Sequence, residues 1–546
     1  MTRPTFADLV LRWADDDGAA VRFEDDVITY RQFAGECLTR AAYLGDRLDP
    51  GADPNVGVLL ENVPDFLYWI GAAAIAGATV VGVNPTRRGA ELARDIAHTK
   101  CQFVVTTTAD AALLADDVAT LLVDQAGYGD ELADYRTAGV PSALPGPAHP
   151  LLLLFTSGST SAPKAVVCST ARLAGAGLRC VAMWGLTRDT VSYCPMPLFH
   201  GNALMACWSP TLAAGGTVVL RRKFSASGFL DDVRRHGCTF FTYVGRSIAY
   251  VLAQPPTEHD RDNRLVLGFG TEASLRDREL FRDRFGCELL ENYGSSESVI
   301  VITRTPDTPP AALGRPEVSA HSDVIVASPE SGEECPPARF DRHGAIENPE
   351  SIGELVNRAG LGTFEGYYDN PEATAARLRN GWYWSGDLAY RDEAGFFYFA
   401  GRSADWLRVD SENFAAAPVE TILHRFAGAV MVAVYPVPDT RTGDQVMAAL
   451  ELRPGEDFDP VAFGRFLADQ PDLGTKWAPR YVRITADIPL TANNKVNKQP
   501  LRSQAWRCDD PVWWRPGREL TYRPLTDADR ETLAAEAAAA GSLRPV

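Results

Sequence analysis

The sequence predicts an α/β protein: a large N-terminal domain of parallel sheets with a small β-barrel, followed by a small α+β domain. A chain of 546 residues is longer than one domain usually is. Before Ser319, short apolar runs alternate with amphipathic segments, a pattern typical of βαβ units in a parallel sheet. Beyond Ser319 the runs become short and β-rich, which favours a small barrel that closes the large domain.

The expected elements follow this alternation along the chain. Before a Pro-, Gly- and Ala-rich connector at 141–150, we expect strands at 56–60, 79–83 and 103–106 and helices at 66–76 and 88–98. After it, we expect strands at 217–220, 240–244, 265–268 and 288–292 and a helix at 225–236. The β-rich part has strands at 322–327, 352–357 and 396–400. The C-terminal part has helices at 418–426 and 460–468, strands at 431–437, 446–452 and 481–484, and an Ala-rich tail helix.

Composition excludes several classes of protein. Hydrophobic residues make up 46% and charged residues 23%, which is ordinary for a globular chain. A net charge of −18 argues against general nucleic-acid binding and against a polybasic membrane anchor. The ten cysteines form no Cys-x-x-Cys, which indicates reduced thiols in a cytoplasmic protein without a zinc site. The N-terminus lacks the apolar core of a signal peptide, and the most apolar stretch, 67–83, is predicted to be a buried helix and strand.

One stretch carries the first chemical signal. The wholly apolar run at 151–155 predicts a strand buried on both faces. Five hydroxyl side chains and one glycine follow it: Thr156, Ser157, Gly158, Ser159, Thr160 and Ser161. Hydroxyl and backbone N–H donors suit an anion, and Lys164 adds a mobile positive charge, so the loop suits a polyphosphate. It is not a Walker A loop, because no Gly-Lys-Ser/Thr occurs at the required spacing. Taken alone, a loop rich in Ser and Thr is more often a polar surface loop after a core strand.

The loop resembles the phosphate-binding loop of the adenylate-forming (ANL) superfamily, which includes acyl-CoA synthetases, peptide-synthetase adenylation domains and luciferases. Their pattern is Thr-Ser-Gly-Thr-Thr-Gly-x-Pro-Lys, and here Ser159 and Ser161 replace a Thr and a Gly. Five further motifs follow in the family's order, so the resemblance covers about residues 20–515. The segments 222–227, 433–439 and 445–449 are most similar to actinobacterial fatty-acid and steroid side-chain CoA ligases.

The resemblance implies a nucleotide site. Residues 268–272 (Gly-Phe-Gly-Thr-Glu) would pack on one face of adenine and Tyr293 on the other, since glycine lets the backbone approach a flat ligand. Glu297 would bind Mg²⁺ as a hard oxygen ligand, and Asp387 would accept both ribose hydroxyls. The implied ATP contacts are Thr156, Ser157, Gly158, Ser159, Thr160, Lys164, Gly270, Thr271, Glu272, Asn292, Tyr293, Gly294, Ser295, Ser296, Asp387, Arg402 and Lys495. The implied catalytic residues are Lys495, Glu297, Ser296 and Thr156.

Substrate contacts are also implied. Residues 196–200 (Met-Pro-Leu-Phe-His) resemble the segment that carries an aromatic or His residue at the acyl site. A histidine in an apolar setting is often purely structural, so both interpretations of His200 remain open. Tyr243, Gly268 and Gly270 are the further expected substrate contacts. The basic stretch 221–223 could touch a phosphate of CoA, although a solvated turn is the plainer interpretation.

The resemblance also implies a domain boundary after Arg402. It gives an adenylation domain at 1–402 and a mobile C-terminal domain at 403–546, with Ala404 as the hinge. Lys495 aligns with the family's catalytic lysine, whereas Lys498 is expected to be solvated. Ser411 stands where the family has a glycine that lines the pantetheine tunnel. The serine would either narrow the CoA tunnel or be a harmless exchange between small residues.

The reaction implied is attack of a substrate carboxylate on the α-phosphorus of ATP, with release of pyrophosphate and later formation of an acyl-CoA thioester. The protein's task would be positioning and charge neutralisation. We expect ATP and Mg²⁺ as cofactors, CoA as co-substrate, and a fatty, steroid-type or terpenoid-type acid. Two alternatives remain open: an adenylating enzyme that hands acyl-AMP to a partner ligase because of Ser411, and a non-catalytic binding homologue. Five retained site residues count against the second: Lys164, Glu297, Asp387, Arg402 and Lys495.

Overall fold

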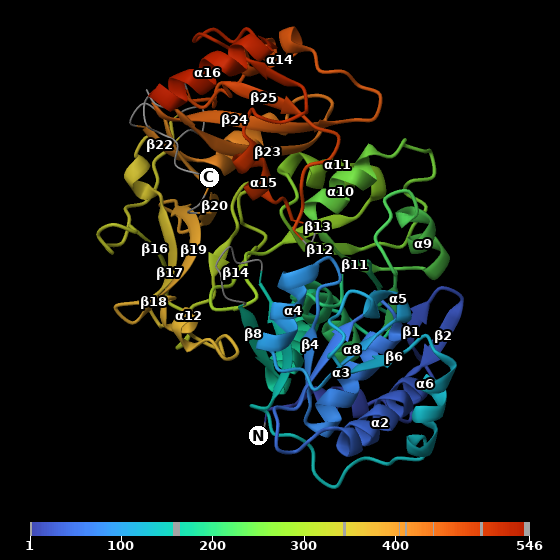
Figure 1. Ribbon diagram of the computed structural model, residues 1–546. Helices are drawn as coiled ribbons and strands as arrows, with labels where there is room; N and C mark the ends of the chain where they lie inside the picture. Colours follow the sequence, from blue (N-terminus) through green and yellow to red (C-terminus); the bar gives the residue numbers. More distant parts are fainter. Residues whose placement is uncertain are drawn as a thin grey trace.

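The computed structural model describes residues 3–156, 164–341, 346–402, 405–409, 412–439, 442–474, 476–491 and 495–539. Two large mixed sheets and their helices form the N-terminal part, a smaller antiparallel sheet follows, and a fourth sheet belongs to the C-terminal part (Figure 1). This is the α/β architecture that the sequence predicts.

The first large sheet has seven strands in the order β13-β12-β11-β9-β10-β1-β2, all parallel except for the β1–β2 hairpin. Its strands are β1 (Ala19–Phe23), β2 (Asp26–Thr29), β9 (Val191–Cys194), β10 (Thr217–Leu220), β11 (Phe240–Val244), β12 (Leu267–Thr271) and β13 (Glu288–Glu291). The helices of this part of the chain include α2 (Tyr30–Arg47), α7 (Thr170–Trp184), α8 (Ser209–Ala214), α9 (Phe229–His236), α10 (Gly245–Ala253), α11 (Leu275–Phe285) and the π-helix η2 (Asn202–Trp208).

The second large sheet has the order β6-β5-β3-β4-β7-β8 and is parallel except for β7–β8. Its elements are β3 (Asn55–Leu59), α3 (Pro64–Ala76), β4 (Thr79–Gly82), α4 (Gly89–His98), β5 (Phe103–Thr106), α5 (Thr108–Ala111), β6 (Thr120–Leu122), α6 (Ala126–Glu131), β7 (Pro150–Phe155) and β8 (Ala165–Ser169). Every residue of β3, β4 and β5 is buried, which explains their apolar runs. Helix α3 begins at a proline and ends at left-handed Gly77, the usual start and stop residues.

The part predicted as a small barrel is an antiparallel sheet of β16 (Val324–Ala327), β17 (Gly353–Asn357), β18 (Leu378–Arg379), β19 (Trp382–Arg391) and β20 (Phe397–Arg402). The hairpin of β14 (Ile302–Thr303) and β15 (Arg315–Pro316) adjoins β20 through a bridge between Gly314 and Phe397. These strands connect the large sheets to the C-terminal part of the chain.

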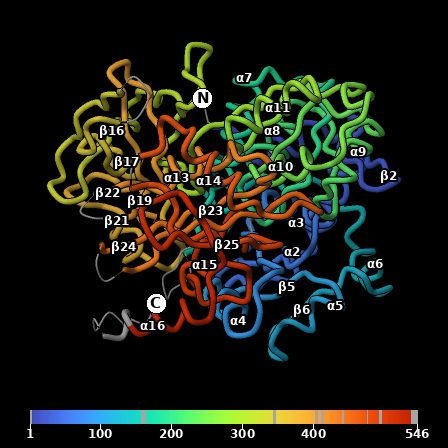
Figure 2. The backbone as a smooth tube through the Cα atoms, turned by 90° about the horizontal axis from the view of Figure 1, so that it is seen from above, coloured from blue at the N-terminus to red at the C-terminus, as the bar shows by residue number. Residues whose placement is uncertain are grey.

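The C-terminal sheet has the order β22-β21-β24-β25-β26-β27, with β23 paired to β24. It comprises β21 (Trp406–Val409), β22 (Glu412–Ala415), β23 (Ala429–Asp439), β24 (Gly443–Leu452), β25 (Tyr481–Ile484), β26 (Val512–Trp514) and β27 (Arg523–Pro524), with α13 (Ala416–Leu423), α14 (Pro460–Ala468), α15 (Lys498–Gln504) and α16 (Asp527–Ala539). It has a core of its own, which includes Leu407, Val434 and Phe463. Strand β23 lies beside α10 of the N-terminal part (Figures 1 and 2).

Three expected elements are displaced, and one of them is the helix expected at 418–426, which is α13 (Ala416–Leu423). The helix expected from residue 225 begins at Phe229, because the hydroxyl of Ser225 accepts the N–H of Gly228 in a local turn before the helix. The strand expected at 265–268 is β12, which extends through the glycines to Thr271. All ten cysteines are free thiols. Within the described ranges, no helix has the length and apolar character needed to cross a membrane.

Candidate active site

The candidate site lies where β11, β12 and β13 end. Gly270 on β12 is in register with Tyr243 on β11 and with Glu291 on β13. Residues 271–272 and 292–293 therefore leave the sheet side by side. The carboxyl ends of parallel strands form the usual ligand edge of an α/β sheet, and two of the predicted motifs meet there.

Lys495 reaches this edge from the C-terminal part of the chain. Its Nζ lies 2.7 Å from Oε1 of Glu272, at the end of β12. Glu272 has φ 71°, in the left-handed region, and its carbonyl crowds the start of α10. A Cβ on Gly245 would lie 1.9 Å from that carbonyl oxygen. The structure thus brings together two residues that were predicted to share one site and that lie 223 residues apart in the chain.

His200 is half-buried, and the positive charge of Lys495 acts on its imidazole. Burial first, and the positive charge of Lys495 second, lower the pKa of His200 to about 3, so the imidazole is neutral near pH 7. Its Nε2 is buried and has no hydrogen-bond partner within the described part of the chain. Its ring packs against Phe199 at 4.4 Å between centroids. A substrate contact at His200 stays a prediction.

The phosphate loop is described only at its two ends. The backbone N–H of Thr156 donates to the carbonyl of Lys164 over 3.0 Å, which closes the base of the loop. The intervening residues, among them Ser157, Gly158, Ser159 and Thr160, lie outside the described residues. Burial and then the charge of Arg377 lower the pKa of Lys164. A bound anion would relieve this repulsion, so the environment suits a phosphate.

Glu297 is held by two residues that sequence reasoning missed. Its side chain is 7% exposed; Tyr367 donates a hydrogen bond to its Oε1 over 2.6 Å, and Arg377 lies 3.6 Å away. Arg377 also donates to the Tyr367 hydroxyl over 3.2 Å and to the Ser385 carbonyl over 3.0 Å. Neither Tyr367 nor Arg377 belongs to a recognised motif, so no local signal could have identified them.

A divalent cation at this position would have one protein carboxylate. No group of three or more His, Cys, Asp or Glu side chains suited to a metal occurs in the part of the chain that the structure describes. Mg²⁺ is commonly bound by one or two carboxylates together with substrate phosphates and water. Glu297 is buried and its negative charge acts on Lys164, so this carboxylate fits a magnesium ion that arrives with a nucleotide.

Asp387, which is predicted to bind the ribose, lies next to Tyr293, which is predicted to cover the adenine. Tyr293 donates a hydrogen bond to Oδ2 of Asp387 over 2.6 Å. Burial, followed by the Asp387 charge, raises the pKa of Tyr293, so this hydroxyl keeps its proton. Asp387 on β19 is in register with Arg402 at the end of β20. Next to Tyr293, Gly294 and Ser295 are exposed, and Asn292 and Ser296 are half-buried.

Three predicted substrate residues pack inside the sheet. Tyr243 is 1% exposed and belongs to a core cluster with Phe241. A Cβ on Gly268 would lie 2.5 Å from the ring of Phe241, and one on Gly270 would lie 2.4 Å from the carbonyl oxygen of Tyr243. The glycines therefore allow β12 to pack on the aromatic residues of β11. Their contact with a ligand stays a prediction.

Two further expectations concern basic residues. In the stretch 221–223 each side chain pairs with a carboxylate, Arg221 with Asp232 and Lys223 with Glu61, as expected for a solvated turn. The expectation that Lys498 is solvated is wrong. Its side chain is 14% exposed, and its Nζ lies 2.8 Å from Glu420 and 3.4 Å from Asp405. Two carboxylates from distant segments compensate its burial, a pairing that sequence spacing cannot reveal.

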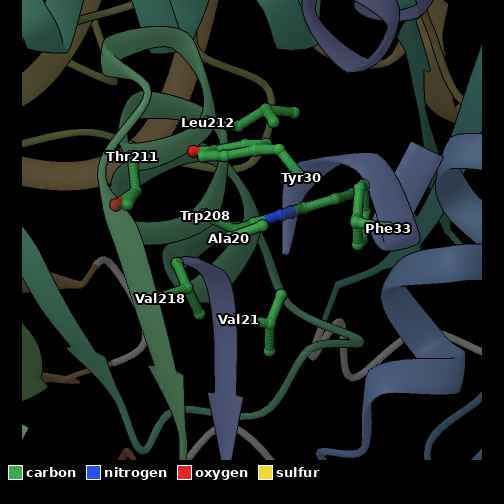
Figure 3. Close-up of a pocket in the computed structure, with 8 residues that line it drawn as sticks. All are labelled: Ala20, Val21, Tyr30, Phe33, Trp208, Thr211, Leu212 and Val218. Atoms are coloured by element: carbon green, nitrogen blue, oxygen red, sulfur yellow. The ribbon is translucent and has the colours of Figure 1, made fainter. Parts of the chain in front are cut away.

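Ala404 and Ser411 lie outside the described residues, so the hinge and the tunnel stay predictions. A small cavity of about 10 Å³ lies elsewhere, between β1, β10 and α2 (Figure 3). It is lined by Ala20, Val21, Tyr30, Phe33, Trp208, Thr211, Leu212 and Val218. Its volume holds about one water molecule, and its lining includes none of the predicted site residues, so it is a packing defect.

Lys495 meets Glu272 at the ends of parallel strands, Glu297 is buried beside Tyr367, and Tyr293 pairs with Asp387. This arrangement defines the class of AMP-forming ligases, which activate an acid as its acyl-AMP. The chain belongs to the AMP-binding enzyme family, whose model matches residues 11–368.

Named relatives agree with this class. The chain is 50% identical over 546 residues to the steroid-22-oyl-CoA synthetase of Rhodococcus jostii (strain RHA1), covering 98% of each chain. It is 46% identical over 512 residues to the medium/long-chain-fatty-acid–CoA ligase FadD17 of Mycobacterium tuberculosis (strain ATCC 25618 / H37Rv), covering 94% of this chain and 99% of the relative.

Solved structures agree with the fold. ATP-bound MatB from Rhodopseudomonas palustris superposes with a TM-score of 0.77 at 25% identity, covering 91% of this chain and 98% of the other. The anthranilate CoA ligase AuaEII in complex with anthranoyl-AMP gives a TM-score of 0.79 at 19% identity, covering 93% of this chain and 98% of the other.

Proposed function

We propose that this protein joins a bulky hydrophobic carboxylic acid, of fatty, steroid or terpenoid type, to CoA through an acyl-AMP intermediate. The observation that carries the proposal is the contact between Lys495 and Glu272, which brings a C-terminal lysine to the ligand edge of the N-terminal sheet. The names of the two relatives support the acid class, because one refers to a steroid-22-oyl group and the other to medium- and long-chain fatty acids.

In the first step a carboxylate oxygen bonds to the α-phosphorus of ATP, and pyrophosphate leaves. Lys164 and Lys495 neutralise charge on the phosphates, and Lys495 exchanges its contact with Glu272 for an oxygen of the nucleotide. Glu297 would hold Mg²⁺, which supplies further charge neutralisation when bound. Tyr367 and Arg377 orient the Glu297 carboxylate. In the second step the CoA thiol attacks the acyl carbon, and AMP leaves with the oxygen that came from the acid.

The remaining assignments are part of the same proposal. Asp387 and Arg402 bind the ribose, Tyr293 covers the adenine, and Ser296 and Thr156 contact phosphate oxygens. The adenylation domain spans 1–402 and the mobile domain spans 403–546, with Ala404 as the hinge. The end of β20 at Arg402 and the start of a separate sheet at Trp406 support this boundary. The ten free thiols support a cytoplasmic location.

A panel of acids tests the proposal. Purified protein is incubated with ATP, Mg²⁺ and hydroxylamine, which traps acyl-AMP as a hydroxamate, and then with CoA in place of hydroxylamine. Steroid-type and long-chain acids should give hydroxamate and acyl-CoA, whereas acetate and benzoate should give little. If no acid of the panel gives a hydroxamate, the proposed function is wrong and the non-catalytic alternative gains support.

Ser411 favours a second candidate, in which the protein adenylates efficiently but forms the thioester slowly and passes acyl-AMP to a partner ligase. The supporting observation is that Ser411 stands where the family has a glycine that lines the pantetheine tunnel. The test compares both half-reactions in the wild type and in Ser411→Gly. A faster CoA step in the variant, with unchanged adenylation, would support the candidate. Rapid ligation by the wild type that glycine does not improve would exclude it.

A further inference from the structure

Lys495 stands at the end of a loop whose two described ends, at 489–491 and 495–497, are joined by hydrogen bonds. The N–H of Thr491 donates to the Lys495 carbonyl over 2.7 Å, and the Lys495 N–H donates to the Thr491 hydroxyl over 3.2 Å. A bridge joins Leu490 to Val496, and the N–H of Asn497 donates to the carbonyl of Pro489 over 2.8 Å. The position of Lys495 therefore depends on where the base of this loop, at residues 487–489, is held.

Hydrogen bonds through Glu451 and one ion pair connect the base of the loop, at residues 487–489, to helix α10. Glu451 on β24 accepts the N–H of Ile488 on Oε2 over 3.3 Å and the hydroxyl of Tyr250 on Oε1 over 2.7 Å. Arg246 lies 2.5 Å from Oδ1 of Asp487, the residue before Ile488. Burial first, and then the hydrogen bond to Glu451, raise the pKa of Tyr250, so its hydroxyl keeps its proton and donates.

Arg246 and Glu451 are shielded from water, whereas the side chain of Asp487 is 74% exposed. Arg246 and Tyr250 are four residues apart on α10, so they face the same side of the helix. The guanidinium of Arg246 lies 4.7 Å from the centroid of the Tyr250 ring and donates to its hydroxyl. Glu451 is 7% exposed, and the Arg246 side chain is 12% exposed. The shielded hydrogen bond from Tyr250 to Glu451 therefore constrains geometry more than the exposed pair of Arg246 and Asp487 does.

The same helix also borders the other end of the Lys495 side chain. Helix α10 starts at Gly245, which is packed against the backbone of Glu272, and Glu272 holds Nζ of Lys495. Ala249, between Arg246 and Tyr250, packs into a core cluster with Met431 and Tyr435 of β23. Helix α10 is thus the common support for the carboxylate that meets the ammonium group and for the loop that carries the backbone of Lys495.

We propose that Arg246, Tyr250 and Glu451 are positioning residues for Lys495, which they hold through the loop that starts at Asp487. The proposal rests on the proposed function, in which Lys495 contacts the phosphates of ATP. A reacting group displaced by about 1 Å can lose roughly a hundredfold in rate, so these contacts affect adenylation although none of them touches the nucleotide. A purely structural role would change the melting temperature and leave the rate of the folded enzyme unchanged.

The test uses Tyr250→Phe and Glu451→Gln, which each remove part of the connection and keep side-chain size. Tyr43→Phe is the matched control, because the Tyr43 hydroxyl also donates to a carboxylate, on Glu131, over 3.0 Å, and belongs to α2. Two quantities are measured in the full-length protein well below its melting temperature. They are acid-dependent ATP–pyrophosphate exchange and the hydrogen-exchange rate of backbone amides in 485–497 without ligands.

Both test variants should lose about tenfold or more in kcat for adenylation with the KM for ATP within about twofold, and their 485–497 amides should exchange faster. Tyr43→Phe should match the wild type in both readouts. Adenylation within about twofold of wild type in both variants, or unchanged amide exchange in 485–497, would overturn the proposal.

Two further comparisons separate the proposal from a general loss of stability and from a failure of the proposed function. A charge exchange, Arg246→Asp with Asp487→Arg, should recover adenylation relative to either single variant, which general loss of stability would not do. If the wild type itself shows no acid-dependent pyrophosphate exchange, the proposed function fails. The amide exchange of 485–497 then still decides whether α10 holds the loop, since that readout needs no substrate.

Discussion

At the scale of the residue, Lys495 matters for its position and contributes little to stability. Its ion pair with Glu272 is partly exposed, and exposed pairs typically contribute about 0–1 kcal/mol. In the proposed function, its ammonium group lies at the edge of the sheet where the phosphates of ATP would bind. The sequence predicted this lysine by resemblance, together with Glu297 and Asp387. It could not predict Tyr367 and Arg377, because only the fold brings them to Glu297.

Lys495→Ala should therefore abolish adenylation and leave the fold intact. Losing one preorganised charge at a developing anion costs about 3 kcal/mol, or more than a hundredfold in rate. The measurement is acid-dependent ATP–pyrophosphate exchange, with the melting temperature recorded in parallel. Lys223→Ala, which removes an exposed ion pair with Glu61, is the control and should behave like wild type. Exchange by Lys495→Ala within about threefold of wild type would refute the assignment.

Glu291, at the end of β13, should make stability depend on pH. Burial raises the pKa of this carboxyl to about 7, against the opposing charge of Arg278 and the N–H of Ala273, which it accepts over 2.5 Å. The native state then binds more protons than the unfolded state between about pH 4.5 and 7, so stability should fall as pH rises through this window. The effect is on the order of 3 kcal/mol at most.

The measurement is the denaturant midpoint of wild type and Glu291→Gln as a function of pH. The variant cannot titrate at this position, so the wild type should lose stability relative to it from pH 4.5 to 7.5. Both proteins contain the other titrating groups, such as Asp95. The contributions of those groups to the pH dependence therefore cancel when the two stability profiles are subtracted. Parallel pH profiles for the two proteins would show that Glu291 is ionised throughout and that the raised pKa is wrong.

At the scale of the element, the close approach of α10 to the end of β12 sets the geometry of the site. Gly245→Ala should push the Glu272 backbone away, because the new Cβ would lie 1.9 Å from its carbonyl oxygen. We expect a loss of about 1–3 kcal/mol in the free energy of unfolding, together with slower adenylation. Gly35→Ala on α2 is the control, since nothing lies within 4 Å of its Cβ position. It should be neutral or stabilising by up to about 1 kcal/mol.

This prediction is checked by denaturant unfolding and pyrophosphate exchange on both variants. If Gly245→Ala matched Gly35→Ala in the free energy of unfolding and in the rate of adenylation, the backbone of Glu272 could shift without changing either quantity. The position of Lys495 would then not depend on the packing between α10 and β12.

The elements that the sequence predicted well have strong local signals. Helix α14 starts at Pro460 after the capping side chain of Asp459, and β5 is a short apolar run. Strand β12 was displaced because residues 268–272 were expected to follow the strand and approach a ligand, whereas the two glycines pack the strand on Phe241 and Tyr243. Helix α10 was missed because it begins with glycine and has no capping side chain. Its role in the fold depends on long-range contacts.

At the scale of the whole molecule, two parts of the chain with separate cores meet at one edge of a sheet. The fold class was predictable because alternating strands and helices determine a parallel sheet whatever its ligand. The meeting of the two parts was predictable only by resemblance. Tyr250 and Glu451 are about 200 residues apart in sequence, and a contact over that separation leaves no local pattern.

The central claim is that the acid is activated as acyl-AMP, and the fate of its carboxylate oxygen tests this most directly. A steroid-type or long-chain acid labelled with oxygen-18 in its carboxylate is converted with ATP, Mg²⁺ and either CoA or hydroxylamine, and the nucleotide is analysed by mass spectrometry. One labelled oxygen should appear in AMP, because the acid oxygen bonded to the α-phosphorus leaves with AMP in the second step. Unlabelled AMP, or formation of ADP with the label in phosphate, would contradict the account.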